Sequence, residues 1–588
     1  MKKIQKTLAA LIAIMLTLTS GAGLFGVSAQ AARGAWLTTW GSSLVNGAIS
    51  LGSVSFQDVI LPGSTIRTEL PVTTAGSKLT FTFSNQYGAA DITIDEAGVA
   101  KTKGNGQADI IDGTQLPITF NGGQTSVTIP AGKTVTSDKV EIKTEALEYI
   151  SVSLYFSHLT YMTSVGLTNG RTFMKRGILD TNSQVNSTYL LGATEVNLSS
   201  GDITYHTIPF LERIDSLSSD ANASAAVFIG DSTLVNNTYL YYAQRLLSAG
   251  VNNISVVNEA IVGNKLLSDG SGMLGNLYGQ ALIDRFRRDV VKITGVKYCF
   301  VKIGVNDILH QFSKSLSDST PKHTVEEIID GYRSLITQCH KWGIKIYFFT
   351  KSAWKGYDRN FLGTGADLEW NEEAQKMCDE ISDWIMNRAS CDGYIDCSEL
   401  EDPSDRTKLC SSLTLDGIHF TDLGAVAMAD LIPLSYVGAD SEGKTAAELV
   451  GVDPYAEKRQ ILAAMSGEGS SSSAGADNKP DEPSSAPQET TSSVPESTTA
   501  PSADTSESNT APAPGDEILS FETPEGVTSP SYAPPPNQDV NYVISDDYSS
   551  PASIGDGANI GFVLAFVLVA AVAITMSALT LARKKEND

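Results

Sequence analysis

Three residues of the chain have side chains and neighbours that are suited to nucleophilic chemistry. Ser232 ends the tripeptide Gly-Asp-Ser, which follows the short apolar run 225–229 and precedes a helical pattern of apolar residues. A serine hydroxyl is a weak nucleophile until a base removes its proton. His419 is a candidate base, because Asp416 lies three residues before it and could orient the imidazole and stabilise its protonated form. The alternative is that Asp416 and His419 only cap a helix over 424–432.

Two further segments could supply hydrogen-bond donors to a developing negative charge. Asn306 follows the apolar run 298–303, so its amide would lie at the carboxyl end of a strand. Gly263 follows the run 254–258, and a glycine there would let a backbone N–H approach the same oxygen closely. Each segment, taken singly, is also typical of an ordinary turn.

The other five histidines are less well placed for a base at a strand end. His310 follows Asn306 closely and could line the same pocket. The remaining four lie in or near the N-terminal β region or beside one helix: His158, His206, His323 and His340.

The elements that must position these side chains alternate between strand and helix from about residue 222 to 440. Five short apolar runs are strand candidates: 225–229, 254–258, 298–303, 344–350 and 394–396. One helix is well marked, since Thr324 and Glu327 form a capping box before an apolar stripe that ends at Gly343. Strands that alternate with helices predict an α/β domain with a parallel sheet covered on both faces.

Taken together and in chain order, the motifs resemble the four blocks of the GDSL-type or SGNH esterases. The matching segments are Gly230-Asp231-Ser232, Gly263, Gly304-x-Asn306-Asp307 and Asp416-x-x-His419. Segments 263–267, 285–290 and 422–425, with 84–88 and 129–132 in the N-terminal region, resemble a bacterial branch that has an N-terminal β domain. The resemblance covers about 34–437 and implies a flavodoxin-like three-layer α/β/α hydrolase domain. The departures from the family pattern are Ala260, Thr233 and Phe420.

The resemblance also implies a role for each matched residue. Ser232 would be the nucleophile, His419 the base and then the acid, and Asp416 its orienting partner. The oxyanion hole would consist of the backbone N–H groups of Ser232 and Gly263 and the side chain of Asn306. The substrate-binding residues are not identified by the resemblance.

Two acidic residues of the motifs are predicted to be structural. Asp231 and Asp307 would be buried near the nucleophile, where acids usually accept backbone hydrogen bonds. We expect no metal and no organic cofactor, since no compact set of histidine and acidic ligands is visible in the sequence.

The N-terminal region 34–210 is predicted to be a β-sandwich. Apolar and polar residues alternate in 79–83 and 150–156, and turn signals break the strands at 121–123 and 130–132. Residues 441–466 are expected to form a helical tail after the hydrolase domain 222–440.

The two ends of the chain predict export and anchoring. Residues 1–31 have the basic start, apolar centre and small-residue end of a signal peptide, and 560–582 are long and apolar enough for a transmembrane helix followed by basic residues. Residues 467–556 are rich in Ser, Thr, Pro and acids, which predicts a disordered stalk. The tail also resembles a Gram-positive sorting signal, so sortase-mediated wall attachment and a single-pass membrane anchor both remain open.

Charge and cysteine content narrow the possible partners. A net charge of −25 argues against nucleic acid. Export permits disulfides. The cysteines expected to take part in them lie in loop-like sequence and are Cys391, Cys397 and Cys410. Cys299 and Cys339 have the pattern of ordinary core residues.

These observations favour an extracellular serine esterase on a Gram-positive-type cell surface that removes acyl groups, above all O-acetyl groups, from polysaccharide. One alternative is a lipase or lysophospholipase, which would need an apolar acyl channel. Another is a non-catalytic carbohydrate-binding surface protein that has kept an esterase fold. Chain-length profiling of ester hydrolysis separates the two enzymatic hypotheses.

Overall fold

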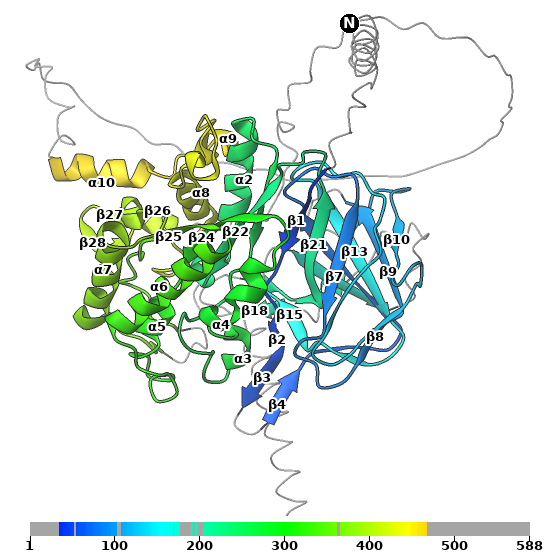
Figure 1. Ribbon diagram of the computed structural model, residues 1–588. Helices are drawn as coiled ribbons and strands as arrows, with labels where there is room; N and C mark the ends of the chain where they lie inside the picture. Colours follow the sequence, from blue (N-terminus) through cyan, green and yellow to red (C-terminus); the bar gives the residue numbers. More distant parts are fainter. Residues whose placement is uncertain are drawn as a thin grey trace, which may run out of the picture. The chain divides into compact units, whose positions relative to one another are not determined.

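A computed structural model of the protein (Figure 1) describes residues 34–466 except 52–53, 103–107, 168–169, 177–189, 192–194, 198–203 and 361–364. The C-terminal half of this part contains a five-stranded parallel sheet. Its order is β23-β22-β24-β25-β26, so the first strand of the domain lies second in the sheet. The strands are β22 (Ser224–Gly230), β23 (Ile254–Asn258), β24 (Val296–Lys302), β25 (Lys345–Phe349) and β26 (Gly393–Ile395).

Helices cover both faces of this sheet because apolar side chains point alternately to each side of the strands. Val227 and Val301 pack with α6 (Val325–Lys341) and α7 (Glu372–Asn387) on one face. Phe228 and Phe300 pack with α2 (Thr238–Ser248) and α8 (Asp422–Asp430) on the other (Figure 1). The predicted three-layer α/β/α fold is thereby confirmed. Among the described residues, the one other helix of eight residues or more is α10 (Ala456–Ser466).

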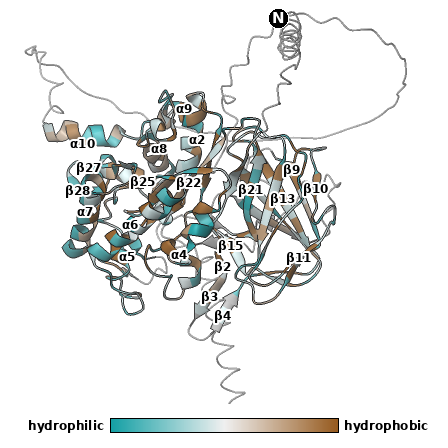
Figure 2. Ribbon diagram, viewed as in Figure 1, coloured by the Kyte–Doolittle hydropathy of each residue, from teal (hydrophilic) through white to brown (hydrophobic). Residues whose placement is uncertain are grey.

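The longest helix begins where the sequence predicts. The Thr324 hydroxyl accepts from the N–H of Glu327, and the Glu327 carboxylate accepts from the N–H of Thr324, so the capping box is formed. Helix α7 presents mainly hydrophilic residues in the view of Figure 2. The short helices are α3 (Gly275–Tyr278), α4 (Leu282–Phe286), α5 (Val305–Leu309) and α9 (Ala446–Val450), and a π-helical turn, Arg287–Val291, follows α4.

The N-terminal half is built of antiparallel strands in two main sheets. The first has the order β1-β21-β7-β12, with strands Trp36–Gly41, Leu211–Leu217, Leu79–Ser84 and Thr134–Thr136. The second has the order β10-β9-β13-β6-β16-β17, with strands Leu116–Ile118, Glu96–Lys101, Tyr149–Phe156, Ser64–Pro71, Arg171–Arg176 and Leu190–Leu191.

Smaller antiparallel pairs and one three-stranded sheet lie beside these two sheets. They are β3 (Ala48–Leu51) with β4 (Val54–Gln57), β5 (Val59–Ile60) with β14 (Thr160–Tyr161), β8 (Ile92–Ile94) with β11 (Val127–Ile129), β18 (Glu195–Asn197) with β19 (Thr204–His206), and β2 (Val45–Asn46) with β15 (Ser164–Gly166) and β20 (Ile208–Pro209). A further pair, β27 (Glu401–Asp402) with β28 (Asp405–Leu409), follows the parallel sheet.

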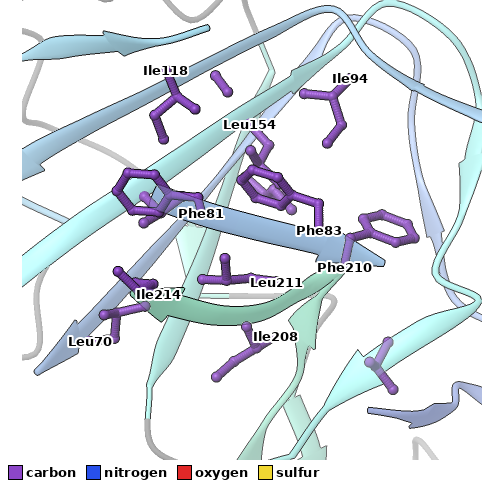
Figure 3. Close-up of a cluster of buried hydrophobic side chains, with 14 of the residues drawn as sticks. Leu70, Phe81, Phe83, Ile94, Ile118, Leu154, Ile208, Phe210, Leu211 and Ile214 are labelled. Atoms are coloured by element: carbon purple, nitrogen blue, oxygen red, sulfur yellow. The ribbon is translucent and has the colours of Figure 1, made fainter. Parts of the chain in front are cut away.

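The two main sheets enclose one apolar core, as expected for a β-sandwich. Phe81, Phe83 and Ile214 come from the four-stranded sheet, and Leu70 and Leu154 from the six-stranded one, and all five are fully or almost fully buried (Figure 3). The alternation of apolar and polar residues places one face of each sheet in this core.

The β region extends beyond the predicted end at residue 210. Strand β21 pairs with both β1 and β7, with Ile214 opposite Trp40 and Phe81, so residues up to Leu217 belong to the first sheet. The six residues between Leu217 and β22 then connect the β region to the parallel sheet. A positive φ at Phe210 marks the irregular entry to β21, which the alternation pattern did not reveal.

Several expectations concern segments outside the described residues, namely the signal peptide 1–31, the stalk 467–556 and the transmembrane helix 560–582. Within the described part of the chain, no helix is long and apolar enough to cross a membrane. The six cysteines, all in that part, are free thiols. The suggested disulfide membership of Cys391, Cys397 and Cys410 is therefore wrong for this structure, where Cys391 and Cys410 donate to the carbonyls of Gly393 and Glu401.

Candidate active site

The three residues proposed for nucleophilic chemistry lie in one hydrogen-bonded chain. His419 Nε2 is 2.9 Å from Ser232 Oγ, and His419 Nδ1 is 2.7 Å from Asp416 Oδ2. An ionised carboxylate only accepts hydrogen bonds, so Nδ1 carries the proton and Nε2 is free to accept from the serine. Ser232 is 9% exposed and His419 7% exposed. The geometry is that of a nucleophile, a general base and an orienting acid.

A tight turn fixes the histidine beside its aspartate. Asp416 Oδ1 accepts from the N–H groups of Ile418 (3.1 Å) and His419 (2.9 Å), and Leu415 N–H donates to the His419 carbonyl. Burial raises the pKa of Asp416, but the hydrogen bond and charge of His419 and the backbone N–H groups outweigh it and hold that pKa below its usual value. Asp416 therefore stays ionised beside the imidazole.

The helix-capping alternative for Asp416 and His419 is wrong. Helix α8 begins after Thr421, whose hydroxyl accepts from the N–H of Gly424 at 3.0 Å. Thr421 therefore fulfils the capping role, and the side chains of the two earlier residues bond to each other and to their own turn.

Ser232 lies directly after strand β22, where the backbone leaves no room for a side chain at Gly230. A Cβ there would lie 1.9 Å from the Lys302 carbonyl oxygen. Asp231 Oδ1 accepts from the N–H and hydroxyl of Thr233, at 3.0 and 2.7 Å. Thr233, one of the departures from the family pattern, thus holds the buried Asp231. Ser232 begins a single 3-10 turn, Ser232–Leu234, and α2 starts only at Thr238.

Burial also sets the electrostatics of Asp231. It raises the pKa of this aspartate, and the nearby charge of Lys302 opposes that shift. Lys302 ends β24 with its Nζ 2.7 Å from Ser352 Oγ. The sequence motifs do not point to this lysine, although a charged residue at the end of an apolar strand is a visible signal.

Asn306 and Gly263 lie in two segments that are bonded to each other. Asn306 is the second residue of α5, and its Nδ2 donates to the Asn264 carbonyl at 3.0 Å. Gly263 has a φ of +66°, and a Cβ there would lie 2.3 Å from the Tyr278 ring. Asp307 accepts from the N–H groups of Leu266 (2.7 Å) and Leu267 (2.9 Å). The expected structural role of Asp307 thus matches its contacts.

The Gly263 segment is also joined to residues 230–234, which we call the nucleophile turn because the proposed nucleophile Ser232 lies in it. Ile261 N–H donates to the Gly230 carbonyl at 3.0 Å, and Asn264 N–H donates back to Ile261. We call residues 259–264 the oxyanion loop. Its glycine and the Asn306 amide have the donor types that stabilise a tetrahedral oxyanion.

Aromatic rings pack around the site. The Tyr357 ring meets His419 edge-on, with centroids 5.5 Å apart, and Tyr278 lies 5.7 Å from the His310 ring. His310 is buried, and burial together with the charges of Arg359 and Lys265 lowers its pKa well below the usual value, so it is neutral. Tyr357 therefore contacts the histidine of the site, and His310, a candidate for lining the same pocket, packs against Tyr278.

A pocket of about 210 Å³ lies elsewhere on the carboxyl edge of the sheet. It is lined by residues after β25 and β26 and by α7, including Lys351, Asp379 and Asp396. None of the triad Ser232, His419 and Asp416 lines it. Burial lowers the pKa of Lys351 to about 8, and its Nζ contacts the Tyr332 hydroxyl and the Ile303 carbonyl. Within the described ranges, no group of three or more His, Cys, Asp or Glu side chains is placed to hold a metal ion.

The family comparison assigns this domain. Residues 215–432 match the sequence model described as GDSL-like Lipase/Acylhydrolase. The range contains the triad, the oxyanion loop and Asn306, and the α/β domain of this chain belongs to that family. The protein is accordingly a hydrolase of ester bonds. A sequence comparison with curated proteins finds no match.

Solved structures that resemble the chain include esterases and lipases. A catalytic mutant of Axe2, an acetylxylan esterase from Geobacillus stearothermophilus, is 19% identical, with a TM-score of 0.28 over 37% of this chain and 96% of that one. A GDSL-like lipase from Bacteroides thetaiotaomicron is 15% identical, with a TM-score of 0.26 over 37% of this chain and 89% of that one. The assignment rests on the family model and not on these structural similarities.

Proposed function

We propose that the protein is a serine esterase that removes small acyl groups, above all acetyl, from polysaccharide outside the cell. The observation that carries the reaction type is the Ser232–His419–Asp416 chain, with 2.9 and 2.7 Å between its members. The acyl group, the polysaccharide and the location are the further parts of the proposal, and each has its own support below.

The reaction follows from the positions of the donors and acceptors. His419 Nε2 takes the hydroxyl proton of Ser232 as Oγ attacks the ester carbonyl, and the imidazolium is stabilised by Asp416. The oxyanion accepts from the backbone N–H groups of Ser232 and Gly263 and from Asn306 Nδ2. His419 then protonates the leaving alcohol, and water, activated by the same imidazole, releases the acid from the acyl-serine.

The surroundings of the triad favour a small acyl group. The Tyr278 ring fills the space against Gly263, and Tyr357 lies against His419. We expect these rings to border an acyl group on Ser232 and to leave little room for additional methylenes. Removal of acetyl groups fits such a site better than hydrolysis of long-chain lipids.

The extracellular location is supported by the sequence pattern of the two ends. The signal-like residues 1–31 and the apolar run 560–582 would place the hydrolase domain outside the cell, on a stalk of Ser, Thr and Pro. A bulky, insoluble polymer suits an enzyme held away from the membrane in this way. Covalent attachment to the wall by a sortase is an extension of the same proposal.

The experiment is hydrolysis of p-nitrophenyl esters and acetylated polymers by the full-length protein. We expect activity on the acetate that falls sharply beyond an acyl chain of about four carbons. A lipase with a fitted acyl channel would instead gain roughly 1 kcal/mol of binding from each methylene. Acetate release from acetylated xylan, pectin or peptidoglycan would then identify the polymer. Activity that rises with chain length, together with lipid cleavage, would contradict the proposal in favour of a lipase.

A further inference from the structure

A fully buried arginine joins the nucleophile turn to the oxyanion loop. Arg285, in α4, has no exposed surface. Its Nη2 donates to the Gly230 carbonyl at 3.1 Å, and its Nη1 donates to the Glu259 carbonyl at 2.9 Å. Its Nε and Nη2 both donate to Asn264 Oδ1, at 3.1 and 3.0 Å. The guanidinium therefore contacts the residue two before Ser232 and both ends of the oxyanion loop.

The same asparagine carries the connection to the third part of the site. The Asn264 carbonyl accepts from Asn306 Nδ2, while the Asn264 side chain accepts from Arg285. Gly263 lies directly before it in the chain. A displacement of Arg285 would thus reach the nucleophile turn, the Gly263 N–H and the Asn306 amide together.

A hydroxyl from the β domain is one of the hydrogen-bond acceptors around the Arg285 guanidinium, and together these acceptors form the seat of Arg285. Arg285 Nη1 donates to Ser43 Oγ at 2.9 Å and to Asp289 Oδ2 at 3.1 Å. Ser43 Oγ also lies 2.8 Å from Glu259 Oε2 and 2.9 Å from Asp289 Oδ2. Ser43 comes from the segment after β1, more than 200 residues away from Arg285 in sequence.

Burial and neighbouring charges set the pKa values of the two acids beside Ser43, Glu259 and Asp289. Burial and the charge of Asp289 raise the pKa of Glu259 well above its usual value. Burial also raises the pKa of Asp289, but Arg288 and Arg285 outweigh it and keep Asp289 ionised. Ser43 Oγ accepts from Arg285, and its hydroxyl lies within donating distance of the Glu259 carbonyl (3.0 Å), Glu259 Oε2 and Asp289 Oδ2, so it links the oxyanion loop to the arginine.

Apolar packing reaches the oxyanion loop from the β domain as well. Ile261 and Val262, directly before Gly263, belong to the apolar cluster of the sandwich core. The strand that precedes Ser43 approaches so closely that a Cβ on Gly41 would lie 2.2 Å from Glu259 Oε1. Polar and apolar contacts from the β domain therefore converge on the same six-residue loop.

We propose that Arg285 is a positioning residue that holds the nucleophile turn and the oxyanion loop in register, and that Ser43 makes the β domain part of the catalytic unit. This proposal rests on the proposed esterase function. It assigns the β domain a role in the alignment of the catalytic groups, in addition to any binding of polymer.

The first test compares Arg285→Lys with Arg245→Lys in the full-length protein. Arg245 is a matched control, since it is also buried and donates to two carbonyls, of Ala429 and Ile432, at the far end of α2 and α8. A lysine keeps the charge in both variants but cannot reproduce the five donors of the guanidinium. Both variants should lose stability to a similar degree, whereas only R285K should lose catalytic power.

The readout is the turnover number per active site. A fluorophosphonate that labels Ser232 gives the number of competent sites, and p-nitrophenyl acetate hydrolysis is divided by that number. We expect R285K to lower kcat per site by about 10- to 100-fold with KM little changed, because small displacements of catalytic groups have effects of that size. Equal kcat per site in R285K, R245K and the parent would show that Arg285 is only structural and would overturn the proposal.

The β-domain part is tested with Ser43→Ala and its control Ser153→Ala. Ser153 is buried in the sandwich and accepts from Arg67 at 2.9 Å, far from the site in the hydrogen-bond network. S43A should lower kcat per site by about tenfold, as expected for the loss of a hydrogen bond to charged groups, and S153A should not. An S43A variant with parental kcat per site would overturn this part, and S43A remains decisive if R285K does not fold.

Hydrogen exchange separates failure of this proposal from failure of the esterase function. A parent that neither hydrolyses esters nor reacts with the fluorophosphonate would refute the proposed function. In that case, faster amide exchange in peptides covering 230–234 and 259–264 of R285K, but not of R245K, would still support Arg285 as the residue that positions these segments. Unchanged exchange in both variants would overturn it.

Discussion

The two halves of the site are constructed in different ways. The acid–base half is local, since Asp416 and His419 are joined within a turn of a few residues and only Ser232 comes from elsewhere. The proposed oxyanion half is assembled from distant parts of the chain: the oxyanion loop after β23, Asn306 in α5, Arg285 in α4 and Ser43 in the β domain.

This difference has a consequence for substitutions. A change in the acid–base half removes a chemical group and leaves the surrounding bonds intact. A change in the oxyanion half disturbs backbone positions that several elements hold jointly, so activity and stability should change together.

The largest effect is expected for Ser232→Ala. Loss of the nucleophile should lower kcat by a factor on the order of 10⁶, as in other serine triads. The midpoint of thermal unfolding should stay close to that of the parent, since the deleted oxygen forms a hydrogen bond to His419 and the backbone of the turn is unchanged. Residual ester hydrolysis at the parental rate would place the nucleophile elsewhere.

Asp416→Asn should be the next most severe change. Asparagine can still accept from the N–H groups of Ile418 and His419, so the turn should persist, but it favours the wrong imidazole tautomer. We expect kcat to fall by about 10⁴-fold with little loss of stability. Steady-state kinetics and circular dichroism of the same sample test this prediction, and a large loss of stability would mean that the acid–base half is less local than the structure indicates.

Asn306→Ala should lower kcat by about 10²–10³-fold, the usual loss for one oxyanion donor. It also removes the bond to the Asn264 carbonyl, so a decrease in unfolding temperature should accompany the loss. Kinetics and thermal unfolding, measured beside Asp416→Asn, compare the two halves directly. An unaltered unfolding temperature in N306A would remove the distinction between them.

Gly263→Ala should destabilise the protein by about 3 kcal/mol, from the positive φ and from the clash with the Tyr278 ring. The control is Gly250→Ala, where φ is +80° and no atom lies within 4 Å of the added Cβ. That variant should lose only about 1 kcal/mol, from backbone strain alone. Urea unfolding of both variants measures the difference. An equal decrease in the free energy of unfolding would show that the Tyr278 ring moves away from the added Cβ at no cost.

The smallest effect is a change in the pH dependence of stability in Glu259→Gln. Burial, Asp289 and Glu212 raise the pKa of Glu259 in the folded protein, although Arg285 opposes them. Its contribution to stability is therefore complete below the unfolded pKa and is lost as pH rises through the folded pKa. Glutamine does not titrate, so the variant does not lose this contribution as pH rises. The free energy of unfolding of the variant relative to that of the parent should therefore increase from pH 5 to pH 8. A pH-independent difference between their urea midpoints would contradict a raised pKa of Glu259 in the folded protein.

Much of the fold could be predicted because its signals are local. Alternating apolar runs and the Thr324–Glu327 capping box depend on neighbours in the chain, and the strands and the helix formed close to the expected residues. The boundary at residue 210 was misplaced because β21 belongs to the first sheet through pairing with β1 and β7, and pairing partners leave no mark in a local pattern. The suggested disulfide membership failed for a related reason, since composition does not reveal which thiols meet.

The sequence by itself determined the chemistry available to this protein, because Ser232, His419, Asp416, Asn306 and Gly263 each stand in a short motif beside a strand or turn. Only the tertiary structure decided how those groups are held. The seat of Arg285 brings together α4, the ends of two strands and the β domain, and such long-range hydrogen bonds depend on packing that no window of the sequence contains.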